Sequence, residues 1–115
     1  MAMTFSSAAH KEVIIVVTTI TKDHGSEFAH HLLQQRLAAC INILSGVFSL
    51  FWWKNKIDET QEDLLIIKTS RKKLSALKKA FKELHPYEVP EFLVLSVSDG
   101  LDSYCNWVLQ ETSVL

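Results

Sequence analysis

The sequence predicts an α/β sandwich, in which helices cover one antiparallel four-stranded sheet. A β-branched run at Glu12–Thr19 has the composition of a buried strand. Between Leu74 and Leu84, leucine and phenylalanine recur at steps of three and four residues, which is typical of a helix with one apolar face. Strand-like and helix-like segments follow the order strand–helix–strand twice, before a last helix.

The first unit begins with Glu12–Thr19, whose continuous apolar run predicts burial on both faces. A loop at 21–26 follows, and its Asp23 or Ser26 could cap the next helix by accepting hydrogen bonds from the free amides. We expect that helix to extend to about Ala39, with its apolar residues on one side.

A long hairpin completes this unit and begins the next. Its first strand, Ile41–Trp53, is apolar on both faces and is interrupted at Ser45-Gly46, where the glycine predicts a bulge or bend. Lys54–Gln61 is expected to form a polar turn with Asn55 in the left-handed region. Glu62–Thr69 returns as the third strand.

A second amphipathic helix, capped by Ser70, is expected over residues 70–84. Pro86 lacks an amide hydrogen and disfavours helical backbone before it, so this helix should end near Leu84. A connector at 85–91 then leads into a strand from Glu91 to about Val97. A last helix is expected at 101–111. Four of its residues should face inward: Leu101, Tyr104, Cys105 and Val108.

This element order predicts the ferredoxin-like architecture, in which two such units interleave into one antiparallel sheet with helices on one face. The other face is then open, and large aromatic residues lie near the hairpin tip: Phe48, Phe51, Trp52 and Trp53. Because exposed apolar area of this size marks an interface, we predict a homo-oligomer in which other copies cover the hairpin. The alternative is that the last helix covers the second face within one chain.

Composition places the chain among folded globular proteins. It has 115 residues, 48% hydrophobic and 22% charged, which suits one domain, expected at residues 11–115 after a frayed leader at residues 1–10. The net charge of −1 gives no general attraction to nucleic acid or to an anionic membrane. No apolar run has the roughly 20 residues of a membrane span. Cys40 and Cys105 are isolated, which fits two buried thiols in a reducing cytoplasm.

The connector at 85–91 concentrates functional groups between a helix and a strand: an imidazole, a phenol and two carboxylates. Loops on a rigid scaffold often carry function, although the two prolines could also serve only as a stiff turn. Most carboxylates of the chain are expected to be solvated, with Glu91 the exception. No serine or cysteine lies in a nucleophile elbow, so we predict no enzymatic activity. The cations at 71–73 could hold an anion at the helix start, or be solvated.

Among the histidines, His85 is the better candidate for a metal ligand. His30 and His31 are neighbours on a helix and diverge by about 100°, so they do not easily share one ion. The backbone of His85 is held by the following proline, although a single loop histidine is more often a hydrogen-bonding residue. The chain has no closed His/Cys set, so no structural zinc site is expected.

Six segments carry a family resemblance: TT at 18–19, RLAACINI at 36–43, SLFWWKNKI at 49–57, EDLLIIKT at 62–69, HPYEVPE at 85–91, and Tyr104 with Trp107. In this order and spacing they resemble the CutA divalent-cation tolerance family over about residues 13–108. The resemblance implies a ferredoxin-like homotrimer whose long hairpins pack across subunits. It also implies an architecture similar to that of the PII signalling proteins, which bind ligands in clefts between subunits.

The resemblance further implies two candidate sites. Some family members bind copper through a thiol on the first strand and a histidine pair before the Pro-Tyr motif; these positions are Thr18 and Leu84-His85 here. Phe51 stands where the family commonly has a tyrosine. A cleft between subunits would be lined by Trp53, Glu62, Lys68, Tyr87 and Glu91.

Three functions follow as hypotheses. The first is a non-enzymatic, cytoplasmic trimer that binds or responds to a divalent metal such as copper, with His85 as the ligand. The second is a PII-like trimer that binds a small anion or a protein partner in intersubunit clefts. The third is a purely structural assembly domain.

Overall fold

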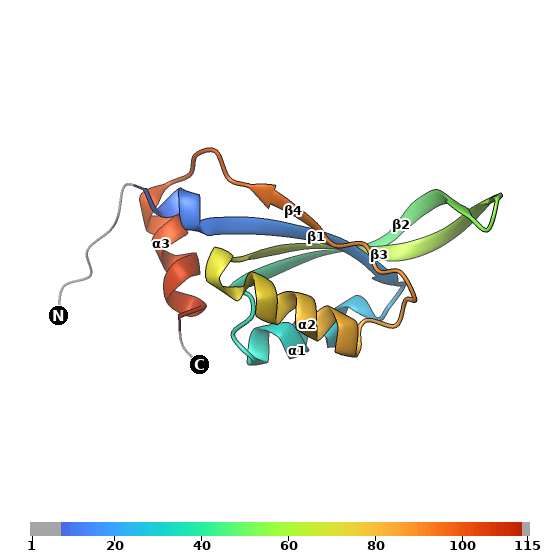
Figure 1. Cartoon of the computed structure of the whole chain (residues 1–115), viewed down its shortest axis with the longest axis horizontal. Coiled ribbons are helices and arrows are strands. Elements are labelled where there is room, and N and C mark those ends of the chain that lie inside the picture. The colour runs from blue at the N-terminus through green and yellow to red at the C-terminus, as the bar shows by residue number, and fades with distance from the viewer. Residues whose placement is uncertain (1–7, 114–115) are drawn as a thin grey trace.

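The computed structural model describes residues 8–113. Its helices and strands are η1 (Ala9–Glu12), β1 (Val13–Thr21), α1 (Gly25–Gln34), β2 (Cys40–Trp53), β3 (Lys56–Ser70), η2 (Arg71–Lys73), α2 (Leu74–Leu84), β4 (Leu93–Ser96) and α3 (Asp102–Glu111). The sheet order is β2-β3-β1-β4, and every neighbouring pair is antiparallel. This is the predicted ferredoxin-like arrangement, and Figure 1 shows α1 and α2 on the same side of the sheet.

The two central strands give the sheet a helix face and an open face. On β1, side chains of even number such as Ile14 and Val16 are fully buried, whereas Ile15 and Val17 are half-buried. The buried set packs against α1 and α2 in the main core. Burial of the first strand on both faces, as predicted, is therefore only partly achieved within one chain.

A second, smaller core closes one end of the sheet. There Ala9 of η1 and Val13 pack with Cys105 and Val108 of α3. Residues 1–7 of the expected leader lie outside the described residues, but Ala9 is buried in this cluster. The prediction of a frayed leader was therefore wrong for Ala9 and His10, which belong to η1.

The hairpin of β2 and β3 extends past the rest of the sheet, along a molecule that is 55 Å long and 26 × 23 Å across (Figure 1). Its register shifts between Leu44 and Val47, and Gly46 there has a φ of 73°, which confirms the predicted bulge. Lys54 and Asn55 alone form the turn, with φ of 50° and 66°, as in a type I′ hairpin.

The prediction of a longer polar turn at Lys54–Gln61 was therefore wrong. Residues 56–61 are polar, yet their backbone continues the ladder with β2 as far as the pair Trp53 and Lys56. Backbone hydrogen bonds form a ladder whether or not the side chains are apolar, so side-chain polarity alone did not mark the turn.

Both ends of α1 differ from the prediction. The helix ends at Gln34, not at Ala39, because Arg36 takes a left-handed φ of 58° and the amide of Leu37 donates to the carbonyl of Leu32. This is a Schellman-type helix end. At the start, neither Asp23 nor Ser26 provides a side-chain cap. The cap is Asp63 of β3, whose Oδ2 accepts from the amides of Asp23 and Gly25, each at 3.0 Å.

The remaining boundaries also shifted. Ser70 makes no cap hydrogen bond, because the 3₁₀ turn η2 comes between it and α2. β4 is limited to the four residues that pair with β1, Leu93–Ser96, in place of the longer strand expected from Glu91 to Val97. Cys40 is half-buried, whereas Cys105 is buried as expected.

The terminal helix does not cover the open face. α3 packs at the end of the sheet against η1 (Figure 1), and two of its predicted inward residues, Leu101 and Tyr104, are exposed. Large apolar side chains of the open face and hairpin remain exposed: Phe48, Leu50, Trp52, Ile57, Leu93 and Leu95. Among residues 8–113, no helix has the length and apolarity needed to cross a membrane.

Candidate functional site: the connector between α2 and β4

The connector His85–Glu91 is attached to the sheet by the side chain of His85. Its Nε2 lies 2.9 Å from the carbonyl oxygen of Thr19 on β1, and its Nδ1 lies 3.2 Å from the amide of Tyr87. A carbonyl only accepts and an amide only donates, so Nε2 carries the proton and Nδ1 carries the lone pair. His85 is thus held as a neutral imidazole with a defined tautomer.

Burial is the main reason that the pKa of His85 is lowered. The imidazole stacks on Phe81 and lies edge-on to Phe28, with ring centroids 5.7 and 5.4 Å apart. The hydrogen bond to Thr19 and the charge of Glu62 act in the opposite direction and do not overcome burial. The neutral form is therefore favoured near neutral pH.

Tyr87 joins the connector to β3. Its hydroxyl donates to Oε2 of Glu62 at 2.5 Å, and Glu62 is only 5% exposed. Burial, followed by this hydrogen bond, raises the pKa of Tyr87 to about 12. The phenol is thus the donor that satisfies a buried carboxylate.

Glu91 is exposed and lies close enough to Glu62 for the two carboxylates to interact electrostatically. Partial burial and the negative charge of Glu62 raise the pKa of Glu91. Two carboxylates and a phenol therefore meet where the hairpin leaves the sheet, because Glu62 pairs with Val47 immediately after the bulge in β2. Such a site could accept a cation or a hydrogen-bond donor.

The other two predicted cleft residues lie elsewhere in the chain. Lys68 is six residues from Glu62 along β3, or roughly 20 Å at the rise of a strand, and its Nζ donates to Oδ1 of Asn42 beside Cys40. Trp53 is at the opposite end, in the last pair of the hairpin. One chain thus brings together Glu62, Tyr87 and Glu91, but not Trp53 or Lys68.

The three positions that the resemblance assigns to copper binding differ in their burial. Thr18 is fully buried on the helix face of β1, where its hydroxyl contacts the backbone of Thr19. Leu84 is exposed and His85 is buried. Among residues 8–113, no group of three or more His, Cys, Asp or Glu side chains is arranged to hold a metal ion.

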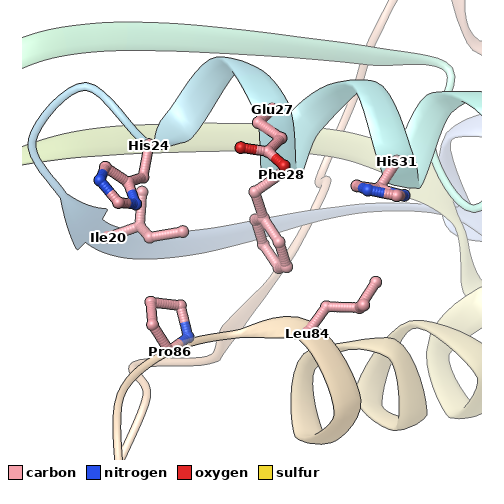
Figure 2. A pocket seen from close by; sticks show the side chains of 7 residues that line it. All are labelled: Ile20, His24, Glu27, Phe28, His31, Leu84 and Pro86. Atoms are coloured by element: carbon pink, nitrogen blue, oxygen red, sulfur yellow. The ribbon is translucent and has the colours of Figure 1, made fainter.

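A separate hollow of about 250 Å³ lies between α1 and the end of α2. Figure 2 shows the ring of Phe28 between His24 and His31, with Leu84 and Pro86 on the opposite wall. Our sequence analysis did not identify this hollow, although the i, i+3, i+7 spacing of His24, Glu27 and His31 would have placed them on one helix face.

Asp63 was also missed. It is buried, it caps α1, and its Oδ1 has no partner among the described residues. Gly25 was the available signal: a Cβ on this residue would lie 2.8 Å from Oδ2 of Asp63, so the carboxylate fits only against a glycine.

The fold and the connector define a class: a small ferredoxin-like protein whose acidic cluster is at the base of a protruding apolar hairpin. Comparison with known proteins specifies it further. The family model described as CutA1 divalent ion tolerance protein matches residues 13–111. The chain belongs to this family.

Individual relatives agree. The divalent-cation tolerance protein CutA of Thermus thermophilus is 36% identical over 101 residues, which cover 88% of this chain and 98% of that protein. The chloroplastic CutA 1 of Oryza sativa is 36% identical over 110 residues, but this chain spans only 62% of its length. Among solved structures, the PII-like protein CutA from Nostoc has a TM-score of 0.82 and 35% identity, covering 86% of this chain and 96% of that one.

Proposed function

We propose that this chain is a non-enzymatic protein that binds or responds to a divalent metal such as copper, and that it works as a homotrimer in the cytoplasm. The observation that carries the metal assignment is the hydrogen bonding of His85. Histidines that bind metals usually donate their other ring N–H to a carbonyl or carboxylate, which fixes the ring. His85 donates from Nε2 to Thr19 in this way, which leaves Nδ1 as the ligating atom.

The amide of Tyr87 occupies that lone pair, at the longer distance of 3.2 Å. A metal ion at Nδ1 would replace this contact, and the connector would have to move slightly to admit it. A single imidazole binds a metal weakly, so the remaining ligands would come from solvent or from another subunit. Imidazole nitrogen suits copper and zinc better than magnesium or calcium.

The trimer is supported by the exposed apolar residues of the hairpin and the open face. Trp52 is 73% exposed and lies on the hairpin that extends beyond the core. Exposed apolar area of this extent favours burial against other copies. The two cysteines are both unpaired, which supports a reducing compartment.

Isothermal titration with copper(II) tests the metal assignment. We expect binding heat for the wild type, loss of that heat for His85→Ala, and retention of it for the matched variant His30→Ala, whose imidazole is exposed and bonds only within α1. Equal heats for all three proteins would reject His85 as the ligand. Light scattering tests assembly, where a trimer has three times the 13.1 kDa mass of one chain.

A PII-like function is the second candidate, and the separation of the cleft residues favours it. Trp53 and Lys68 lie on opposite sides of Glu62 along the hairpin, so they could join one cleft only if different subunits contributed them. Such a cleft would combine a lysine, two carboxylates and aromatic rings. A thermal-shift screen discriminates: stabilisation by a small anion in the presence of a chelator supports this function over metal binding.

A further inference from the structure

Half of the cationic residues of the chain lie in one short segment. Residues 71–82 contain six of the twelve Lys and Arg residues and none of the thirteen Asp and Glu residues. The rest of the chain therefore carries all of the acidic residues and is strongly negative. This segregation is hidden by the net charge of −1.

The fold places five of these cations on one exposed face. Leu77, Ala80 and Phe81 are the buried side of α2. At about 100° per residue, the other side of α2 presents Lys78, Lys79 and Lys82 within about 100° of arc, and the exposed Arg71 and Lys72 of η2 precede them. We call this the basic face; its members are Arg71, Lys72, Lys78, Lys79 and Lys82, all exposed.

Helix stability explains only part of the basic face, since Lys82 alone lies in the last turn of α2, where the dipole favours cations. Cations at 71–73 precede the N-terminus of α2, where the helix dipole favours anions, and no acidic residue lies in the first turn. Lys78 and Lys82 are like charges at i, i+4 spacing, which also disfavours the helix. None of the five forms an ion pair with another residue of the described chain, in which the salt bridge is Arg36–Glu111.

The basic face also remains accessible in an oligomer. Figure 1 shows α2 on the side of the sheet away from the open face, and the apolar residues expected to meet other copies are on the hairpin and the open face. The basic face is separate from the connector and does not depend on metal binding there.

We propose that the basic face docks an acidic segment of a partner protein. Its cations are four lysines and one arginine, which attract charge without the paired geometry that arginine offers to phosphate. A membrane or a nucleic-acid duplex is an extended anionic surface and would also come near the acidic residues that flank the basic face, of which Glu83 follows Lys82 directly. A short acidic segment contacts the basic face alone.

Fluorescence anisotropy with a labelled oligoglutamate peptide tests this docking. We expect wild-type protein to bind the peptide, with weaker binding as salt is raised. The triple variant Lys78→Glu/Lys79→Glu/Lys82→Glu should bind at least about tenfold more weakly, since three exposed ion pairs are lost. The matched control Lys22→Glu/Lys54→Glu/Lys56→Glu changes the net charge equally on exposed residues elsewhere and should stay within about threefold of wild type.

Three outcomes would overturn the proposal. The first is that the wild type fails to bind oligoglutamate. The second is that both triple variants lose affinity equally, which would mean that only net charge acts. The third is that duplex DNA or phosphatidylserine vesicles bind more tightly than the peptide through the same lysines. Circular dichroism verifies folding. If the charge-reversed helix unfolds, Lys78→Gln/Lys79→Gln/Lys82→Gln replaces it, with a smaller expected loss in the same direction.

Discussion

Replacing Tyr87 with phenylalanine tests the cluster at the base of the hairpin. The substitution removes only the hydroxyl, so the ring can keep its edge-on contact with His85, at 4.8 Å between centroids. Glu62, which is 5% exposed, then loses the donor that lies 2.5 Å from its Oε2. Leaving a buried charged acceptor without its partner is more costly than the mean value of a hydrogen bond.

The expected cost follows from this environment. Hydrogen bonds to charged groups contribute about 1.5–3 kcal/mol, and Tyr87 is itself half-buried, so we expect Tyr87→Phe to lower the free energy of unfolding by about 2 kcal/mol. For a chain of this length, that loss corresponds to a fall in Tm of roughly 5–10 °C.

Guanidinium and thermal denaturation, followed by circular dichroism at one fixed protein concentration, measure this cost. Glu62→Gln and the double variant complete a double-mutant cycle, in which we expect a coupling energy of about 1–2 kcal/mol between the two side chains. A stability loss below about 0.5 kcal/mol, which is typical of surface substitutions, or a coupling energy near zero would refute the argument that Tyr87 satisfies a buried carboxylate.

Three further predictions concern pH, packing and assembly. The pKa of His85 is lowered in the folded chain, so its contribution to the free energy of unfolding should be complete above its ordinary pKa of about 6.5 and be lost as pH falls from there through the lowered pKa; an NMR titration midpoint at or above 6.5 would contradict this. Gly25→Ala brings a Cβ to 2.8 Å from Oδ2 of Asp63 and should cost about 1–3 kcal/mol of stability in chemical denaturation, whereas a neutral result would show that Asp63 can move aside. Trp52→Ser removes the most exposed aromatic ring of the hairpin and should lower the mass measured by light scattering at micromolar concentration; an unchanged mass would place the interface elsewhere.

The sequence predicted the fold well where side-chain pattern and backbone pairing coincide. The apolar runs located β1 and the core of β3, the leucine repeat located α2, and Pro86 ended that helix at Leu84. The pattern failed at 56–61, where polar residues are paired in the ladder, because a ladder needs backbone groups and not apolar side chains.

The candidate site was predictable only as a set of residues. The connector was identified from its two prolines and its functional groups, and the structure places Tyr87 on Glu62. Asp63 was missed because its role as cap for α1 depends on strand register: Ile20 pairs with Asp63 across the sheet. Contacts between residues about forty positions apart in sequence leave no local signal, except that Gly25 must lack a side chain.

One chain of hydrogen bonds links the two halves of the site. Thr19 on β1 accepts from His85, Nδ1 of His85 accepts from the amide of Tyr87, and the hydroxyl of Tyr87 donates to Glu62 at the base of the hairpin. A ligand that takes the lone pair of His85 must therefore release the backbone of the residue whose hydroxyl satisfies Glu62. If that movement also displaces the phenol, Glu62 loses its hydrogen-bond donor at the position where the hairpin begins to extend beyond the core. His85 and the base of the hairpin are thus connected through Tyr87, so the phenol, and not only the histidine, should be varied in tests of metal response.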